Sequence, residues 1–297
     1  MKNAYVEITN CCNLNCDFCP GHSRKPKHMS AREFETVLDK LEGRVENLFL
    51  HVMGEPLLHP EFDEIIALAD KTNVKLKITT NGTLLSSGIH ILERSKNLHT
   101  VFISIHSFGG TREGSSSEKS TEEYICQCFE ASRRLAAAGK FAVLRLWNLE
   151  EGGSSPLNEY NQEVLKLAEK YFPPQREEWV KTHRGQRIAT HVFIEWGERF
   201  DWPDPERATE MPTYDGEYGC ENCHALLTQF GVLSDGTVVP CCLDRNGDIP
   251  LGNIFESEIE EILSCERAKK MRDAMAHHRF SEPLCKSCGF KRNAKKK

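Results

Sequence analysis

Short β-branched apolar runs alternate with helical segments over the first two hundred residues. This alternation is typical of βα units around a parallel sheet, because each strand returns to the same sheet through a crossover helix. Ser30 with Glu33 and Ser120 with Glu123 form capping-box patterns, and Pro60 stands where a first-turn proline is expected. The pattern predicts six strands, at residues 4–9, 47–52, 75–80, 100–105, 141–147 and 191–196.

The pattern changes in the last quarter of the chain. Apolar runs at 227–232 and 237–241 flank Asp235-Gly236, a hairpin signal, and a helix is expected over 256–276. We therefore predict an α/β fold with three parts. Residues 1–200 form an open, partial (β/α)6 TIM-like barrel, 201–219 form a linker, and 220–297 form a small cysteine-rich α+β domain of a β-hairpin plus helix. The Gly- and Ser-rich stretch 109–119 is expected to be a mobile loop.

The composition of the chain narrows the range of possible functions. The net charge of −6 gives no general attraction to nucleic acid, and no apolar run approaches the roughly 20 residues of a membrane span. The first residues leave no room for a signal peptide, so a cytoplasmic location is expected. Thirteen cysteines, an odd number, argue against a complete disulfide framework and favour metal or cluster ligation.

Three cysteines, Cys12, Cys16 and Cys19, follow the first predicted strand directly. They place three thiolates on one short loop at the carboxyl ends of the strands, the active face of such barrels. Three ligands on a cubane of four irons leave one iron open. A structural zinc knuckle is the alternative, but zinc needs a fourth ligand nearby. The adjacent Cys11 is outside this spacing and is expected to be structural.

This CxxxCxxC spacing, with the aromatic Phe18 before the last cysteine, resembles the signature of the radical S-adenosylmethionine (radical SAM) superfamily. The segment Met53-Gly54-Glu55-Pro56 is similar to the family's GGEP motif, which binds the SAM amino group, with Met53 in place of the first glycine. Thr80-Asn81-Gly82 and Ser104-Ile105-His106 end the next two strands, where the family places SAM contacts. The resemblance implies SAM contacts at Phe18, Gly54, Glu55, Pro56, Asn81, Ser104, His106 and Arg145.

The alternative for several of these residues is an ordinary structural role. His51, Asn81 and His106 are also typical strand-end residues that satisfy backbone groups. Cys126 and Cys128 lie in a helical stretch and are expected in the core or at its boundary.

The second cysteine group closes the chain. Twelve residues separate Cys223 from Gly236, Cys241 follows with the spacing GxxxxC, and Cys285-Lys-Ser-Cys288 supplies a CxxC pair. This resembles the SPASM/twitch extension of radical SAM enzymes, which holds an auxiliary 4Fe-4S cluster. Because no cysteine follows Cys288, the one-cluster twitch arrangement is favoured, with ligands Cys223, Cys241, Cys285 and Cys288.

The auxiliary site leaves alternatives open. Cys242 could replace Cys241, Cys220 could replace Cys223, and a zinc ribbon could replace the cluster. Cys265, on the predicted helix, is expected to be structural.

The resemblance implies that the protein cleaves SAM reductively to a 5'-deoxyadenosyl radical, which removes a hydrogen atom from a substrate. A fully ligated auxiliary cluster can accept one electron, so we expect a two-electron dehydrogenation of a small molecule, as in enzymes of the 2-deoxy-scyllo-inosamine dehydrogenase type. A peptide- or protein-modifying maturase is the alternative, weakened because only eleven residues precede the cluster. Epimerisation or rearrangement would give the second cluster less to do.

A non-enzyme alternative is an electron carrier or zinc-binding interaction module, which would not need SAM contacts. The expected reductant is a small flavodoxin or ferredoxin. His106 and Glu195 are equal candidates for a general base. Trp147, Trp196 and Trp202 are candidates for the pocket lining, although strand tryptophans more often lie in the core.

Overall fold

The computed structural model describes residues 1–109, 120–149, 159–173, 176–206, 223–277 and 279–290. Among them, one sheet of eleven strands runs in the order β11-β10-β9-β1-β2-β3-β4-β5-β8-β7-β6. Six of its strands are consecutive, parallel and close to the six predicted ones. They are β1 (Asn3–Val6), β2 (Asn47–Phe49), β3 (Lys75–Thr80), β4 (Leu98–Ile103), β5 (Phe141–Leu149) and β8 (Val192–Glu198). The sheet is open at both ends, so the predicted α/β class and partial barrel are confirmed.

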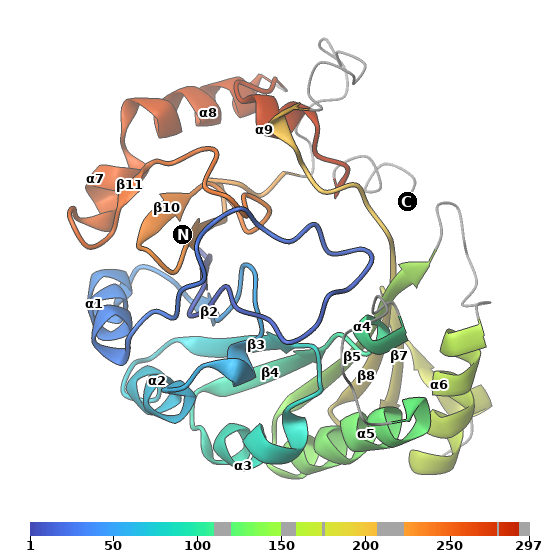
Figure 1. The fold of residues 1–297 in the computed structure, drawn as a ribbon. Helices are drawn as coiled ribbons and strands as arrows, with labels where there is room; N and C mark the ends of the chain where they lie inside the picture. The colour runs from blue at the N-terminus through green and yellow to red at the C-terminus, as the bar shows by residue number, and fades with distance from the viewer. Residues whose placement is uncertain (110–119, 150–158, 174–175, 207–222, 278, 291–297) are drawn as a thin grey trace.

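Helices cover the outer side of the curved sheet (Figure 1). They are α1 (Ala31–Leu41), α2 (Phe62–Ala69), α3 (Leu85–Arg94), α5 (Thr121–Ala137) and α6 (Glu159–Tyr171). The chain also forms the short helices η1 (Pro56–Leu58), α4 (His106–Gly109) and η2 (Arg176–Glu178). Both predicted capping boxes form, at Ser30 with Glu33 and at Ser120 with Glu123. The expectation for Pro60 is wrong, because α2 begins at Phe62 with Glu61 as its N-cap, and Pro60 precedes the helix.

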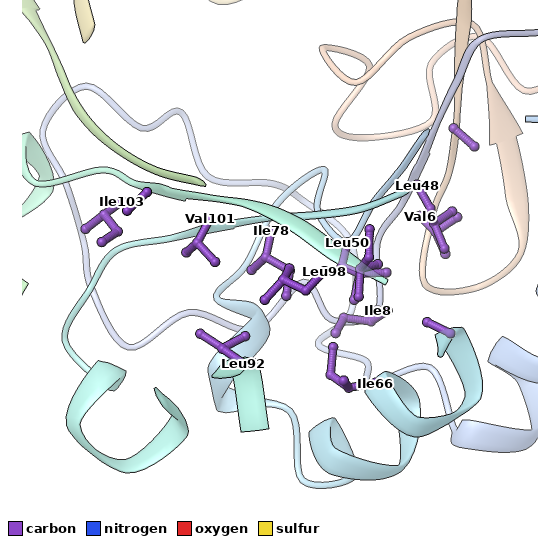
Figure 2. Close-up of a cluster of buried hydrophobic side chains, with 14 of the residues drawn as sticks. Val6, Ile8, Leu48, Leu50, Ile66, Ile78, Leu92, Leu98, Val101 and Ile103 are labelled. Atoms are coloured by element: carbon purple, nitrogen blue, oxygen red, sulfur yellow. The ribbon is translucent and has the colours of Figure 1, made fainter. Parts of the chain in front are cut away.

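Successive residues of each strand point to opposite faces of the sheet, and the two faces differ in composition. Val6, Leu48, Leu50, Ile78 and Ile103 face the helices and are fully buried in one apolar core (Figure 2). The residues between them point to the opposite side. There, aromatic, charged and polar side chains, half-buried except for the buried Phe49, form what we call the inner face: Tyr5, Phe49, His51, Lys77, Thr79, Phe102, Arg145, Trp147 and Glu195.

The C-terminal segment joins the same sheet. β9 (Gln229–Val232) pairs in parallel with β1, and β10 (Thr237–Val239) and β11 (Gly252–Asn253) continue from it antiparallel. The predicted hairpin therefore forms at Gly236, whose φ of +85° suits glycine. The single helix expected over 256–276 is wrong: α7 (Ile259–Leu263) ends before Cys265, whose sulfur accepts the Ala268 N–H and caps α8 (Glu266–Ala276).

The sequence analysis missed two short strands at the other sheet edge, β6 (Val180–Lys181) and β7 (Gly185–Ala189), which pair antiparallel beside β8. Helix α9 (Pro283–Lys286) carries Cys285 near the end of the chain. The glycine- and serine-rich stretch, Cys220 and most of the predicted linker lie outside the described residues.

Candidate active site

The loop that carries Cys12, Cys16 and Cys19 leaves β1 at the carboxyl ends of the parallel strands. Neighbouring strand ends bind it: the Asn81 side-chain amide donates to Cys12 Sγ at 3.8 Å, and Cys16 Sγ donates to the Ser107 carbonyl at 3.7 Å. Within the loop, Cys19 N donates to the Cys16 carbonyl at 3.2 Å. Contacts from the end of β3 and from α4 thus fix the thiols of Cys12 and Cys16, while the Cys19 backbone is fixed within the loop.

The three thiols lie close enough to influence one another's protonation. Burial raises the pKa of the Cys16 thiol to about 12, and the neighbouring Cys19 and Cys12 add to this effect. Burial also raises the pKa of Cys12. Three thiolates in this position would repel one another, and cationic iron bound to them would offset that repulsion. This donor set fits a cluster held by three cysteines.

Gly54 brings the second motif against this loop. Its φ is +77°, and a Cβ on it would stand 2.4 Å from the Thr9 carbonyl and 2.9 Å from the Cys11 carbonyl. The next residue closes the contact, since Glu55 N donates to the Cys11 carbonyl at 2.8 Å. Only glycine allows the backbones of the two loops to approach so closely.

The Glu55 side chain is buried and turned toward β3. Its carboxylate accepts the Thr80 hydroxyl at 2.8 Å and the Asn81 N–H at 2.6 Å. Burial raises the pKa of Glu55 to about 7, although these hydrogen bonds act in the opposite direction. Glu55 also caps η1, whose first residue is the buried Pro56.

The Ser-Ile-His segment lies on the other side of the cysteine loop. His106 is buried, its Nδ1 lies 2.8 Å from the Arg145 carbonyl, and its ring centroid is 4.9 Å from that of Phe18. Burial lowers the pKa of His106 to about 4. Ser104 is half-buried, and its N–H donates to the Thr80 carbonyl at 2.8 Å. His106 thus contacts the cysteine loop through Phe18 and bonds to a backbone carbonyl, while the SAM contacts of Ser104 and His106 stay predictions.

The inner face begins directly below the cysteine loop. The Tyr5 and Phe49 rings stack at 4.4 Å, and the His51 ring meets the Tyr5 ring edge-on at 5.6 Å. The Arg145 guanidinium lies 3.8 Å from the Phe102 ring centroid. Four strands thus supply one aromatic surface with a cation on it.

Arg145 is fixed from several sides. It forms an ion pair with Glu195 at 3.3 Å, donates to the Thr79 hydroxyl at 3.4 Å and lies 4.3 Å from the Trp147 ring. The two other predicted tryptophans differ from Trp147: Trp196 packs against the main core, and Trp202 packs near Cys19.

Two buried polar atoms on the inner face have no hydrogen-bond partner among the described residues: His51 Nδ1 and Trp147 Nε1. Burial and the Arg145 charge lower the pKa of His51 to about 3, so its imidazole is neutral at physiological pH. Buried polar groups are normally hydrogen-bonded. A bound ligand on the inner face would supply the missing partners.

The auxiliary cysteines lie on the other side of β1. Cys223 and Cys241 pack together against Ala225 and Met275, and Cys285 lies within electrostatic range of Cys241. Burial raises the pKa of Cys241 well above its ordinary value. The structure thus brings Cys223, Cys241 and Cys285 near one another, while Cys288 lies within electrostatic range of Cys242. Their ligation of a second cluster stays a prediction.

The α9 region is fastened to the chain that follows β8. Gly289 N donates to the Asp201 carbonyl at 3.0 Å, and Asp204 N donates to the Ser287 hydroxyl at 2.9 Å. Cys288 lies between these contacts. The first residues of the predicted linker therefore pack directly on the CxxC pair.

The sequence analysis missed a buried ion pair, which joins the loops at the strand ends to the C-terminal hairpin. Glu7 is fully buried and binds Arg24 at 2.7 Å. Its carboxylate also accepts the N–H groups of Met53 and Ser234, each at 3.1 Å, while Arg24 donates to the Arg245 carbonyl at 2.8 Å. One carboxylate thus connects the cysteine loop, the Gly54 loop and the C-terminal hairpin.

Three cysteines on one loop at the strand ends of a partial barrel, with a second cysteine group in the same sheet, are the arrangement expected of an iron-sulfur protein. Residues 6–138 match the model of the radical SAM superfamily, and residues 223–289 match the SPASM model, an iron-sulfur cluster-binding domain. The chain therefore contains a radical SAM domain followed by a SPASM domain. These domains imply 4Fe-4S clusters and SAM as cofactors, as predicted.

Several curated proteins are similar to this chain, and some of them are named for maturation or for bacteriocin biosynthesis. The mycofactocin maturase MftC of Mycobacterium tuberculosis is 30% identical over 143 residues, covering 47% of this chain and 35% of MftC. Two Bacillus subtilis proteins align over most of this chain. The sporulation killing factor maturation protein SkfB is 22% identical, covering 90% of this chain and 66% of SkfB. The subtilosin biosynthesis protein AlbA is 26% identical, covering 97% and 65%. The chain thus spans between about a third and two thirds of these relatives' lengths.

Solved structures share the fold. The anSMEcpe structure with bound AdoMet has a TM-score of 0.61 at 15% identity, covering 98% of this chain and 89% of that chain. BtrN in complex with AdoMet and 2-DOIA has a TM-score of 0.57 at 16% identity, covering 97% and 92%. Streptococcus suis SuiB bound to SAM has a TM-score of 0.58 at 15% identity, covering 97% and 72%. Among the described residues, the helices are too short or too polar to cross a membrane.

Proposed function

We propose that this protein is an enzyme that cleaves SAM reductively on a cluster held by Cys12, Cys16 and Cys19. The observation that carries the proposal is the position of Cys12, Cys16 and Cys19 on one loop at the strand ends, where Cys16 is buried, Cys19 is half-buried and Cys12 is exposed. When bound, the cluster and SAM together supply a carbon-centred oxidant that removes a hydrogen atom from the substrate. The expected electron donor is a flavodoxin or ferredoxin.

The chain's own residues position the reactants. Asn81 and the Ser107 carbonyl fix the orientation of the cysteine loop, and Gly54 lets the adjacent loop close against it. Arg145 presents a buried positive charge on the inner face for a carboxylate, such as that of SAM. The aromatic surface around Arg145 excludes water, which strengthens its interaction with an anion.

We infer that the substrate is a peptide side chain or backbone carbon. AlbA and SkfB, which align over nearly the whole chain, are named for bacteriocin biosynthesis and for peptide maturation. SuiB, which shares the fold, has been crystallised bound to its precursor peptide SuiA.

A two-electron dehydrogenation of a small molecule, with the auxiliary cluster as electron acceptor, is the second candidate. It is favoured by the match to BtrN, of which this chain covers 92% and which was crystallised with 2-DOIA. In this candidate, Cys223, Cys241, Cys285 and Cys288 hold the electron acceptor beside the inner face.

The decisive experiment measures iron, sulfide and 5'-deoxyadenosine after anaerobic cluster reconstitution, with SAM and dithionite. The wild-type chain is expected to form 5'-deoxyadenosine, and Cys12→Ala is expected to form none. Cys126→Ala is the matched control, since Cys126 lies on α5 away from both cysteine groups. Equal activity of Cys12→Ala and wild type would overturn the proposal.

The substrate class is tested by the rate of 5'-deoxyadenosine formation in the presence of added compounds. Stimulation by members of a synthetic peptide library supports the peptide assignment. Stimulation by 2-DOIA and not by peptides supports the second candidate.

A further inference from the structure

Residues 20–32, which follow Cys19 directly, are basic although the chain as a whole is acidic. They contain Arg24, Lys25, Lys27 and Arg32, two histidines and neither aspartate nor glutamate, whereas the net charge of the chain is −6. We call this segment the basic loop. It places a local positive charge beside the first cysteine group, and the proposed function gives this charge no role.

Asn10 holds the basic loop against the loop of the three cysteines. Asn10 is buried, its side-chain amide donates to the Lys25 carbonyl at 2.9 Å, and its side-chain oxygen accepts the Lys27 N–H at 2.8 Å. The His22 Nε2 lies 2.9 Å from the Asn10 carbonyl. Because Asn10 stands two residues before Cys12, these contacts keep the basic loop next to the first cysteine group.

Two cations of the basic loop are available to a partner. Lys25 and Arg32 are exposed, and within the part of the chain that the structure describes neither forms an ion pair. The other two, Arg24 and Lys27, already form ion pairs with carboxylates of this chain. The positive charge that faces solvent therefore comes mainly from Lys25 and Arg32.

The two cysteine groups differ in exposure. Cys12 is exposed, whereas Cys223, Cys241, Cys285 and Cys288 are each half-buried. An electron carrier must bring its own cofactor close to the group that it reduces. The first cysteine group is the more accessible of the two from outside the molecule.

We propose that the basic loop is the docking surface for the electron donor, a carrier protein with an acidic surface around its redox cofactor. This inference rests on the proposed function, in which an external donor reduces the cluster on Cys12, Cys16 and Cys19. One electron passes from the reduced carrier to that cluster, the carrier is oxidised by one electron, and no covalent bond forms or breaks. Electrons then enter directly at the first cysteine group and not through the second.

Charge suits a complex of this kind, because electron-transfer encounters are transient and bury little surface. Complementary charges raise the rate of encounter and orient the partners, and salt weakens both effects. Lys25 and Arg32 should therefore control how fast the carrier reaches the cluster, without taking part in the reaction that follows.

The test compares two reductants on the reconstituted full chain with SAM. Dithionite is a small molecule that needs no docking surface, and a bacterial flavodoxin, reduced by its reductase and NADPH, serves as the carrier. In the charge-reversal variant Lys25→Glu/Arg32→Glu, we expect 5'-deoxyadenosine formation with flavodoxin to fall about tenfold or more at low salt. With dithionite, the rate should stay near that of the wild type. The milder variant Lys25→Gln/Arg32→Gln should lose less of the flavodoxin-driven rate.

The matched control is Lys269→Glu/Lys270→Glu, which reverses two exposed lysines on α8. Met275 of the same helix packs with Cys223 and Cys241 of the second cysteine group. This variant should keep the flavodoxin-driven rate of the wild type. A loss confined to this variant would place electron entry at the second cysteine group and overturn the inference.

The affinity of the full chain for flavodoxin, measured by titration without SAM, provides a readout that is independent of catalysis. The wild-type Kd should rise with salt, and the charge reversal should weaken binding several-fold and flatten the salt dependence. Equal affinities and equal flavodoxin-driven rates in wild type and the charge-reversal variant would overturn the inference.

An equal loss of rate with both reductants would make the basic loop a structural support of the cysteine loop, which would also overturn it. Absence of 5'-deoxyadenosine from the wild-type reaction with dithionite would instead refute the proposed function.

Discussion

Glu7→Ala should lower the free energy of unfolding, because the Glu7 carboxylate takes part in several buried interactions at once. The substitution leaves the Arg24 guanidinium, which is only 12% exposed, without its carboxylate partner. It also removes the acceptor for the N–H groups of Met53 and Ser234. Breaking one side of a buried ion pair costs about 3–5 kcal/mol, because the remaining charge stays buried.

That free energy converts into a melting temperature. An unfolding entropy of about 2.1 cal/mol/K per residue gives about 0.6 kcal/mol/K for the 297 residues. A loss of about 3–5 kcal/mol therefore corresponds to a decrease in Tm of about 5–8 °C. Calorimetry of the anaerobically reconstituted protein measures this change directly.

The control is Glu130→Gln on α5. Its ion pair with Arg133, at 3.7 Å, is more than half exposed on both sides, so Tm should change by less than about 1 °C. The double variant Glu7→Leu/Arg24→Leu should recover part of the loss, because it leaves no unpaired charge. Equal effects of Glu7→Ala and Glu130→Gln on Tm would refute the argument that this ion pair joins the two halves of the molecule.

Three further outcomes are expected. Gly54→Ala should cost at least about 1 kcal/mol from its left-handed conformation alone, with further loss from the clash with the Thr9 carbonyl, and should weaken SAM binding; unchanged Tm and SAM affinity would contradict this. For Glu55, the folded chain retains a proton that the unfolded chain releases, so stability should fall as pH rises from about 4.5 to about 7; Tm measured across this range should slope less in Glu55→Gln, and an equal slope would count against the raised pKa. Cys285→Ala should remove about half the iron while 5'-deoxyadenosine formation continues, and loss of both would make the C-terminal cysteines structural.

The parallel sheet and the first cysteine group could be predicted because their signals are local. A strand such as Lys75–Thr80 shows its period and its boundaries in consecutive residues, and the spacing of Cys12, Cys16 and Cys19 is complete within eight positions. The capping box at Ser30 and Glu33 is equally local. No distant residue is needed to read any of these patterns.

The prediction failed where neighbouring signals compete. The stretch 256–276 has helical composition throughout, but Cys265 accepts a backbone N–H and begins a second helix, because a side-chain acceptor favours an N-cap over a helix interior. The proline signal is also imprecise by two positions, because α2 begins at Phe62 and Pro60 lies just before its N-cap residue Glu61.

The sequence by itself identified the cysteines that are expected to hold clusters and the loops that carry them. Only the tertiary structure decided what each one faces: Cys241 turns toward Cys223, Cys242 turns toward Tyr5 and the inner face, and Glu7 reaches three separate loops. Pairing of β9 with β1 brings the C-terminal hairpin to the cysteine loop more than two hundred residues away in the chain. Contacts over such separations depend on how the whole sheet closes, which no local pattern of residues encodes.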